Sequence, residues 1–337
     1  MASLGELIVR VGANIDNFER SMGTVSQRLN AIDRQADKAF SGFDRIGSRL
    51  TDIGGTLTGA VTLPLGVIAA GALTVAGNFE QSMAKIKAFG DISGDSLEGL
   101  RKQALKLGAD TQFSAQQAAD AMAVFASANF NAEQIAAAMP GTLQLAAAGM
   151  ITVGESAKFV SDVLGQFQLS AADTGRIADV MAAALKDTQA TMTELGSTLT
   201  YVGPIASGAG QSLEETTAAI IALDVAGLRG ERAGTGLRGV IGSLVDPSKE
   251  AAKVLGPDGL GLSLSDSAGK MRPLSDIMEQ FRTKLGGVTN EVDRQQMVFQ
   301  VFGREAGNAA QVLINTGGPA LDAYEKKLLG SHGAAKT

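Results

Sequence analysis

Helix-start signals recur along residues 114–215 at nearly constant spacing. In each signal, a Ser, Thr or Asn is followed three residues later by Gln, Glu or Asp. This is the pattern of a capping box. In a capping box, the side chains of both residues accept hydrogen bonds from backbone N–H groups at the helix start that would otherwise be unbonded. Two series interleave, with spacings of 38 and 39 residues in the first and 39 and 42 in the second: Ser114–Gln117, Thr152–Glu155 and Thr191–Glu194, then Asn131–Gln134, Ser170–Asp173 and Ser212–Glu215. Helices therefore start every 17 to 21 residues, which predicts a compact array of about three two-helix units. Because side-chain similarity between the units is weak, both a duplicated unit and an ordinary helical bundle remain open.

The rest of the chain extends this pattern and predicts an all-α fold class with one short strand near the start. Residues 4–11 are β-branched and partly alternating, so residues 1–52 are expected to hold a short strand and a coiled-coil-like helix. Residues 80–330 are expected to form a helical core domain, with a Gly-rich insert at about 256–273. Near its end, separate helices are expected at 290–303 and 304–315. Residues 331–337 are expected to be a truncated tail without a stabilising cap.

An unbroken heptad repeat follows the expected strand. Its apolar positions, separated by alternating steps of four and three, define the heptad seam: Phe18, Met22, Val25, Leu29, Ile32, Ala36, Ala39, Phe43, Ile46, Leu50, Ile53 and Leu57. An apolar seam this narrow is covered by another helix rather than by a globular core. It indicates either a self-associating coiled coil or one arm of an intramolecular hairpin. We favour self-association, because no partner helix of equal length and regularity follows.

Residues 53–79 contain no charged side chain. As a helix they would extend about 40 Å, against about 30 Å of bilayer hydrocarbon, so length permits insertion into a membrane. Insertion would be marginal because Gly, Ala and Thr dilute the large apolar residues. The residues expected to insert are Leu57, Val61, Leu63, Leu65, Val67, Ile68, Leu73 and Val75, and the glycines expected to let helices pack closely are Gly55, Gly59 and Gly66. We therefore expect a conditional segment, which packs within a helical assembly first and enters lipid later.

Composition removes much of the usual catalytic and metal chemistry. The chain has no Cys, and its only His is His332. Cys- and His-based zinc sites and His-dependent catalytic triads are therefore excluded within these residues. The net charge of −6 argues against a nucleic-acid binder with a basic surface. We expect no catalytic residue, no metal site and no cofactor.

One glycine motif has two readings. Gly234, Gly236 and Gly239 match the GxGxxG fingerprint of dinucleotide-binding proteins, but that fingerprint requires a preceding strand. Here the preceding segment is helical by its capping signal and periodicity. We expect these glycines to let two helices cross closely instead. Acidic residues elsewhere in the helices are expected to lie on solvent-facing surfaces.

Five segments carry a family resemblance: GNFEQSMAKIKAF at 77–89, LRKQALKLGADTQFSAQQAADAMAVFASANF at 100–130, LAAAG at 145–149, YVGPIASGAGQSLEETTAAIIALDVAGLRGERAGTGLRG at 201–239 and VFGREAGNAAQVLI at 301–314. In this order and spacing, they resemble the core region of tail tape-measure proteins of long-tailed bacteriophages and prophages. The resemblance covers about residues 75–330. The strand, long helix and apolar stretch that precede it are similar to the usual amino-terminal arrangement of that family.

The resemblance implies a non-enzymatic structural protein that lies in the lumen of the tail tube. Such a protein sets tail length during assembly in the host cytoplasm. At infection it leaves through the tip to help the genome cross the host envelope, and we expect part of it to enter the host inner membrane. This chain would be an amino-terminal fragment, with any peptidoglycan-hydrolase domain beyond residue 337.

The partners implied are further copies of the chain through the heptad helix, the tail-tube protein, tail-tip or baseplate proteins, tail assembly chaperones and the host membrane, with genomic DNA only indirectly involved. The alternative is an α-helical pore-forming toxin or effector, because such a protein also combines long helices with a latent apolar segment.

Overall fold

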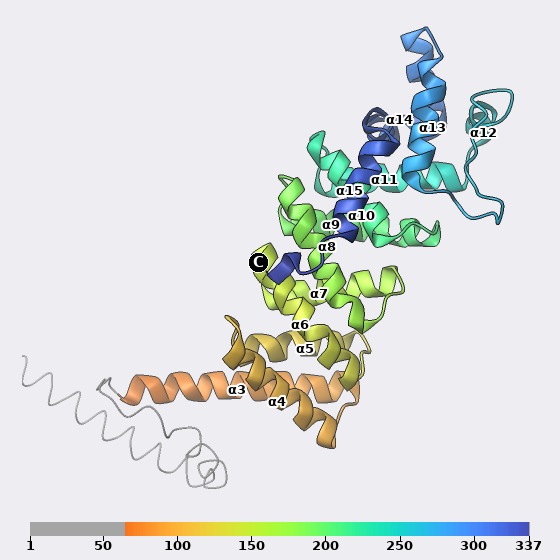
Figure 1. The fold of residues 1–337 in the computed structure, drawn as a ribbon. Coiled ribbons are helices and arrows are strands. Elements are labelled where there is room, and N and C mark those ends of the chain that lie inside the picture. Colours follow the sequence, from red (N-terminus) through yellow and green to blue (C-terminus); the bar gives the residue numbers. More distant parts are fainter. Residues whose placement is uncertain (1–64, 337) are drawn as a thin grey trace, which may run out of the picture. The chain divides into compact units, whose positions relative to one another are not determined.

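The computed structural model describes residues 65–336, with side chains from residue 76 to residue 335. Within these residues the chain is all-α: it forms thirteen α-helices, α3 to α15, two 3₁₀ turns and no strand (Figure 1). The strand expected at 4–11, the whole heptad seam and the start of the apolar segment lie outside the described residues. Contacts divide the chain into two compact units, Met1–Asn78 and Phe79–Thr337. The packing described below is that of the second unit.

The elements follow one another with short connections. Their bounds are α3 Leu65–Gly90, α4 Gly94–Asp110, α5 Ala115–Ser127, α6 Ala132–Gly149, α7 Val153–Gln166, η1 Ala171–Asp173, α8 Thr174–Asp187, α9 Met192–Gly208, α10 Leu213–Val225, α11 Gly230–Val245, α12 Lys249–Leu255, α13 Leu274–Gly286, α14 Glu291–Thr316, α15 Gly318–Leu329 and η2 Ala334–Lys336.

All six predicted helix starts are confirmed as capping boxes. At the start of α6, the side-chain oxygen of Asn131 accepts from the Gln134 N–H at 2.9 Å, and the Gln134 side chain accepts from the Asn131 N–H at 2.9 Å. The box at Ser170 opens the 3₁₀ turn η1, which leads directly into α8. A short local pattern thus sets where each helix of the array begins.

Alternate helices of the array stack in two rows. In one row α5 packs on α7, α7 on α9 and α9 on α11, while in the other α6 packs on α8 and α8 on α10 (Figure 1). Close stacking needs small residues at the crossings. Gly141 of α6 provides one, because a Cβ there would lie 2.5 Å from the carbonyl carbon of Thr174 at the start of α8.

Helix α10 lies at the centre of the helices between α8 and α15. Eleven of its 13 residues are buried, and it contacts α8, α9, α11, α13, α14 and α15. A helix enclosed on every side needs no polar face, and α10 accordingly lacks the one-sided apolar stripe of a surface helix. Between α8 and α15 the core therefore surrounds this helix rather than lying beneath it.

The C-terminal segment folds back onto earlier helices. Helix α15 packs on α10, α13 and α8, and η2 packs on α8 and α6. Our expectation that the final residues lack a stabilising cap is wrong. The carboxylate of Asp179 in α8 accepts hydrogen bonds from the N–H groups of Gly333 at 2.8 Å and Ala335 at 3.0 Å.

The Gly-rich insert between α12 and α13 is a loop rather than a pair of strands. A single antiparallel bridge joins Ser265 and Met271. Gln280 of α13 fixes the loop from outside, because its amide accepts from the Ser263 N–H at 2.8 Å and donates to the Ser263 carbonyl at 3.0 Å. Gln211 holds the far end, since it accepts from the Leu274 N–H at 2.9 Å.

Replacing Gly141 by Ala should lower the free energy of unfolding by about 1–3 kcal/mol, because the new methyl group meets the backbone of α8 and the helices must separate. The matched control is Gly99→Ala in α4, where an added Cβ meets nothing within 4 Å and where the change should add roughly 0.5–1 kcal/mol. Urea unfolding of both variants measures the difference. Equal effects of the two substitutions would contradict the close crossing.

Candidate functional site

The described residues hold no cluster of three or more His, Cys, Asp or Glu residues that could bind a metal ion. Across residues 65–336, no individual helix combines the length and apolar character needed to cross a membrane. Only α6 and α7 taken together meet that test, and they are bent by 118° at the break between them.

The glycines of the GxGxxG match lie inside helix α11, not in a loop after a strand. They make close contacts on two sides: Gly234 faces α9, and Gly236 and Gly239 face α14. An added Cβ at these three positions would lie 2.7 Å from Tyr201 Cβ, 2.8 Å from Ala309 Cβ and 2.7 Å from Ala306 Cβ, respectively. The prediction that they permit close helix crossings is confirmed.

Helix α10 carries two buried carboxylates, one near each end. Glu214 has a side chain 2 % exposed, and its two oxygens accept from Nε and Nη2 of Arg176 in α8, each at 2.6 Å. This two-pronged hydrogen bonding raises the pKa of the Arg176 guanidinium above its ordinary value, against the opposing effect of burial. The pair ties α10 to α8 at a fixed register.

Asp224, at the other end of α10, has a side chain only 3 % exposed. It lies 3.0 Å from Nε of Arg229 and accepts a hydrogen bond from the Gln189 N–H at 3.0 Å. The expectation that acidic residues lie on solvent-facing surfaces is thus wrong for Glu214 and Asp224. Because α10 is enclosed on all sides, its acids are buried with it and each needs a cationic partner.

Glu325 of α15 lies against this same region. Burial raises the pKa of its carboxyl group most, and the negative charges of Glu215, Asp322 and Glu214 raise it further, while Lys326 opposes them. The contact between α15 and α10 therefore concentrates acidic charge at a partly buried position.

Helix α14 is two helices joined by one residue. Gly303 has φ 70° and ψ 179°, a conformation that interrupts the helix and that glycine adopts without strain. The first and last turns of α14, represented by Glu291 and Asn315, line one cavity together with α13, so the two halves lie alongside each other. The break predicted between residues 303 and 304 is confirmed.

Phe299 holds the two halves of α14 together. Its ring lies over Gly307, where an added Cβ would come within 2.4 Å of the ring edge. On the other side, Phe302 meets Phe281 of α13 with ring centroids 5.3 Å apart. The first half of α14 is thereby fixed between its own second half and α13.

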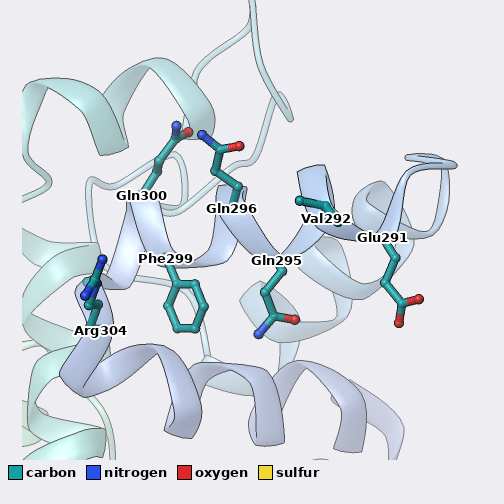
Figure 2. A pocket seen from close by; sticks show the side chains of 8 residues that line it. Glu291, Val292, Gln295, Gln296, Phe299, Gln300 and Arg304 are labelled. Carbon is teal, nitrogen blue, oxygen red and sulfur yellow. The ribbon is translucent and has the colours of Figure 1, made fainter.

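An open groove of about 800 Å³ runs along this first half. We call its lining the α14 stripe, and it consists of eight residues: Glu291, Val292, Gln295, Gln296, Phe299, Gln300, Gly303 and Arg304. Figure 2 shows Gln295 and Phe299 pointing toward a neighbouring helix, while Gln296 and Gln300 point to the opposite side. Figure 2 shows Glu291 at one end of the stripe and Arg304 at the other, with the amides and Phe299 between them.

The residues predicted from the N-terminal sequence remain predictions. The heptad seam, Gly55, Gly59, Leu57, Val61 and Leu63 lie outside the described residues. The other predicted residues of the apolar segment lie within helix α3, of which the structure describes only the backbone at these positions: Leu65, Gly66, Val67, Ile68, Leu73 and Val75.

Comparison with known proteins gives a consistent result. Residues 101–303 match the model of a family described as "Phage-related minor tail protein". The chain is 35 % identical over 332 residues to the "Tape measure protein" of Pneumococcus phage Dp-1, an alignment that covers 98 % of the chain and 28 % of that relative. It is 30 % identical over 335 residues to the "Probable tape measure protein" of Escherichia phage P2, covering 91 % of the chain and 40 % of that relative.

The chain thus spans less than half the length of either curated relative. Neither relative is described as a pore-forming protein. No solved structure matches the chain.

Replacing Glu325 by Gln should stabilise the protein at pH 7. Folding raises the pKa of this carboxyl group, so the protonated form favours the folded protein. That contribution to stability is lost as the pH rises from the ordinary carboxyl range through the raised pKa. The ionised form is therefore unfavourable at neutral pH, and removing it should raise the free energy of unfolding by about 0.5 kcal/mol or less. Near pH 4, where the group is largely protonated, the gain should vanish.

Urea unfolding at the two pH values measures this gain. Glu305→Gln, at an exposed position of α14, is the control. A larger gain for Glu325→Gln at low pH than at neutral pH would contradict the assignment.

Proposed function

Because the chain belongs to the family of phage-related minor tail proteins, we propose that it is part of a tail tape-measure protein. The observation that carries this proposal is the name shared by both curated relatives, which align with nearly the whole chain. In this role the protein lies in the lumen of the tail tube and sets tail length during assembly. At infection it leaves through the tip and helps the genome cross the host envelope.

The two kinds of segment in the chain suit different parts of this role. An extended helix converts residue number into length at about 1.5 Å per residue, whereas a compact array does not lengthen in proportion to its residues. The heptad repeat of residues 18–57 is predicted from the sequence to be of the first kind. The stacked helices α4 to α15 are of the second kind. We therefore assign length determination to extended helix and anchoring to the compact unit.

The proposed partners follow from the same role. Copies of the chain associate through the heptad seam, and the assembled protein contacts the tail-tube protein, the tail-tip or baseplate proteins and the tail assembly chaperones. Residues 53–79 pack within this assembly until infection and then enter the host inner membrane. The role is structural, so any hydrolase activity toward peptidoglycan belongs to a segment outside these residues.

Duplicating about five heptads of the seam should lengthen tails by about 50 Å, because the added residues extend a continuous helix. The control is an insertion of the same length in the loop between Gly256 and Pro273, which lies outside the helices of the compact unit and should leave tail length unchanged. Electron microscopy of tails from the encoding phage or prophage measures both.

If both insertions changed the tail length by the same amount, the assignment of length determination to the heptad helix would be contradicted. The broader proposal depends on a separate observation. If tails form with normal length after the gene is deleted, or if purified tails lack the protein, the chain is not a tape-measure protein.

A further inference from the structure

A polar cavity of about 460 Å³ lies between α13 and the two halves of α14. We call it the α13–α14 cavity. Each of the three helical segments contributes residues three and four positions apart, so one face of each segment is turned toward the cavity. Each segment also contributes one buried aliphatic residue to the lining: Leu285, Val298 and Ile314. The other lining side chains are polar, and they include Arg294 and Gln295.

Arg294 has no partner for its charge among the described residues. Its Nε is buried and makes no hydrogen bond there, and no carboxylate lies within ion-pair distance of it. Arg229 and Arg272 also have a buried Nε without a hydrogen bond, but each of them lies beside an acid. These acids are Asp224 and Asp276. A half-buried cation without a partner is unfavourable, so an anion would be stabilised beside Arg294.

We propose that the α13–α14 cavity binds a carboxylate group through the guanidinium of Arg294. A guanidinium presents a planar fork of N–H donors that matches the two oxygens of a carboxylate. Asn315 supplies further donors, because its side-chain oxygen accepts from Gln311 Nε2 at 3.0 Å and its amide N–H groups are left for a ligand. The three aliphatic residues of the lining suit a short hydrocarbon chain that carries the carboxylate.

The charges around the cavity favour a ligand with a single negative charge. Arg282 also lines the cavity, but its Nε and Nη2 donate to Glu279 at 2.9 and 2.6 Å, so its charge is already matched. Glu291 adds a negative charge to the lining, but it is exposed and therefore screened by solvent. One unmatched guanidinium thus faces the cavity, and a phosphate dianion would exceed its charge.

A short free acid and the side chain of a glutamate in a partner protein share this chemistry, since each carries one carboxylate on a few methylene groups. Butyrate and a glutamate capped at both its amino and carboxyl groups represent the two sources. Butyramide has the shape of butyrate without its charge, so it shows how much binding depends on the carboxylate. Inorganic phosphate represents the other class of anion.

NMR titration of the full chain with these four compounds at pH 6.5 tests the proposal. The side-chain Nε–H signals of the arginines report which guanidinium is contacted, and Arg294→Gln identifies the signal of Arg294. The matched control is Arg304→Gln, because Arg304 is also an arginine of α14 without an ion pair among the described residues, but it does not line the cavity.

We expect butyrate to shift the Arg294 signal and to bind about tenfold or more tightly than butyramide. Arg294→Gln should weaken the binding of butyrate by about tenfold or more, while Arg304→Gln should leave it unchanged. Glu291→Gln should strengthen it, because a like charge is removed from the lining. Tighter binding of the capped glutamate than of butyrate would assign the site to a side chain of a partner protein, and the reverse would assign it to a free acid.

Equal binding of butyrate and butyramide, tighter binding of phosphate than of butyrate, or equal losses in the two arginine variants would each overturn the proposal. The comparison of the compounds uses the unaltered chain, so it holds even if a variant fails to fold. None of these measurements involves tails, so the inference stands or falls separately from the proposed function.

Discussion

The enclosure of helix α10 is the constraint on which the packing of the helices around it, from α8 to α15, depends. Six other helices contact this one helix, so their positions are set by a shared core element rather than by pairwise contacts alone. Enclosure also forces its two acids, Glu214 and Asp224, out of water, and each is matched by an arginine from a neighbouring segment. Removing one member of such a pair is costly, because the other is left buried without a partner. Apolar burial supplies the stability and the ion pairs fix the register.

Helices α11 and α14 both pack on this centre and on each other. Helix α11 lies between α9 and α14, with glycines at both crossings. The hairpin of α14 packs its second half on α11, and its first half carries the α14 stripe. The same single residue, Gly303, both reverses the chain and lies at the end of the stripe. The α14 stripe is therefore positioned by the core, not by a separate flexible loop.

Sequence reasoning predicted the features that depend on near neighbours in the chain. Each capping box spans three residues, and the break at Gly303 and the small residues at the α11 crossings are visible as local patterns. It missed the pairing of Glu214 with Arg176, which lie 38 residues apart, and the anchoring of Gly333 by Asp179, which lie 154 residues apart. Such contacts depend on how the rows of helices stack. Only a weak signal in the sequence indicates that the acids of α10 are buried. The sequence places acidic residues in a helix that has no polar face to keep them in solvent.

A double-mutant cycle on Arg176 and Glu214 tests the role of the α10 ion pair most directly. Arg176→Met should lower the free energy of unfolding by about 3 kcal/mol because it leaves Glu214 buried and unpaired. Adding Glu214→Leu should recover much of that loss, giving a coupling energy on the order of 1–3 kcal/mol. The same cycle on the exposed pair Arg101–Glu80 should give less than about 1 kcal/mol. Equal coupling in the two cycles would show that the buried pair does not fix the position of α10.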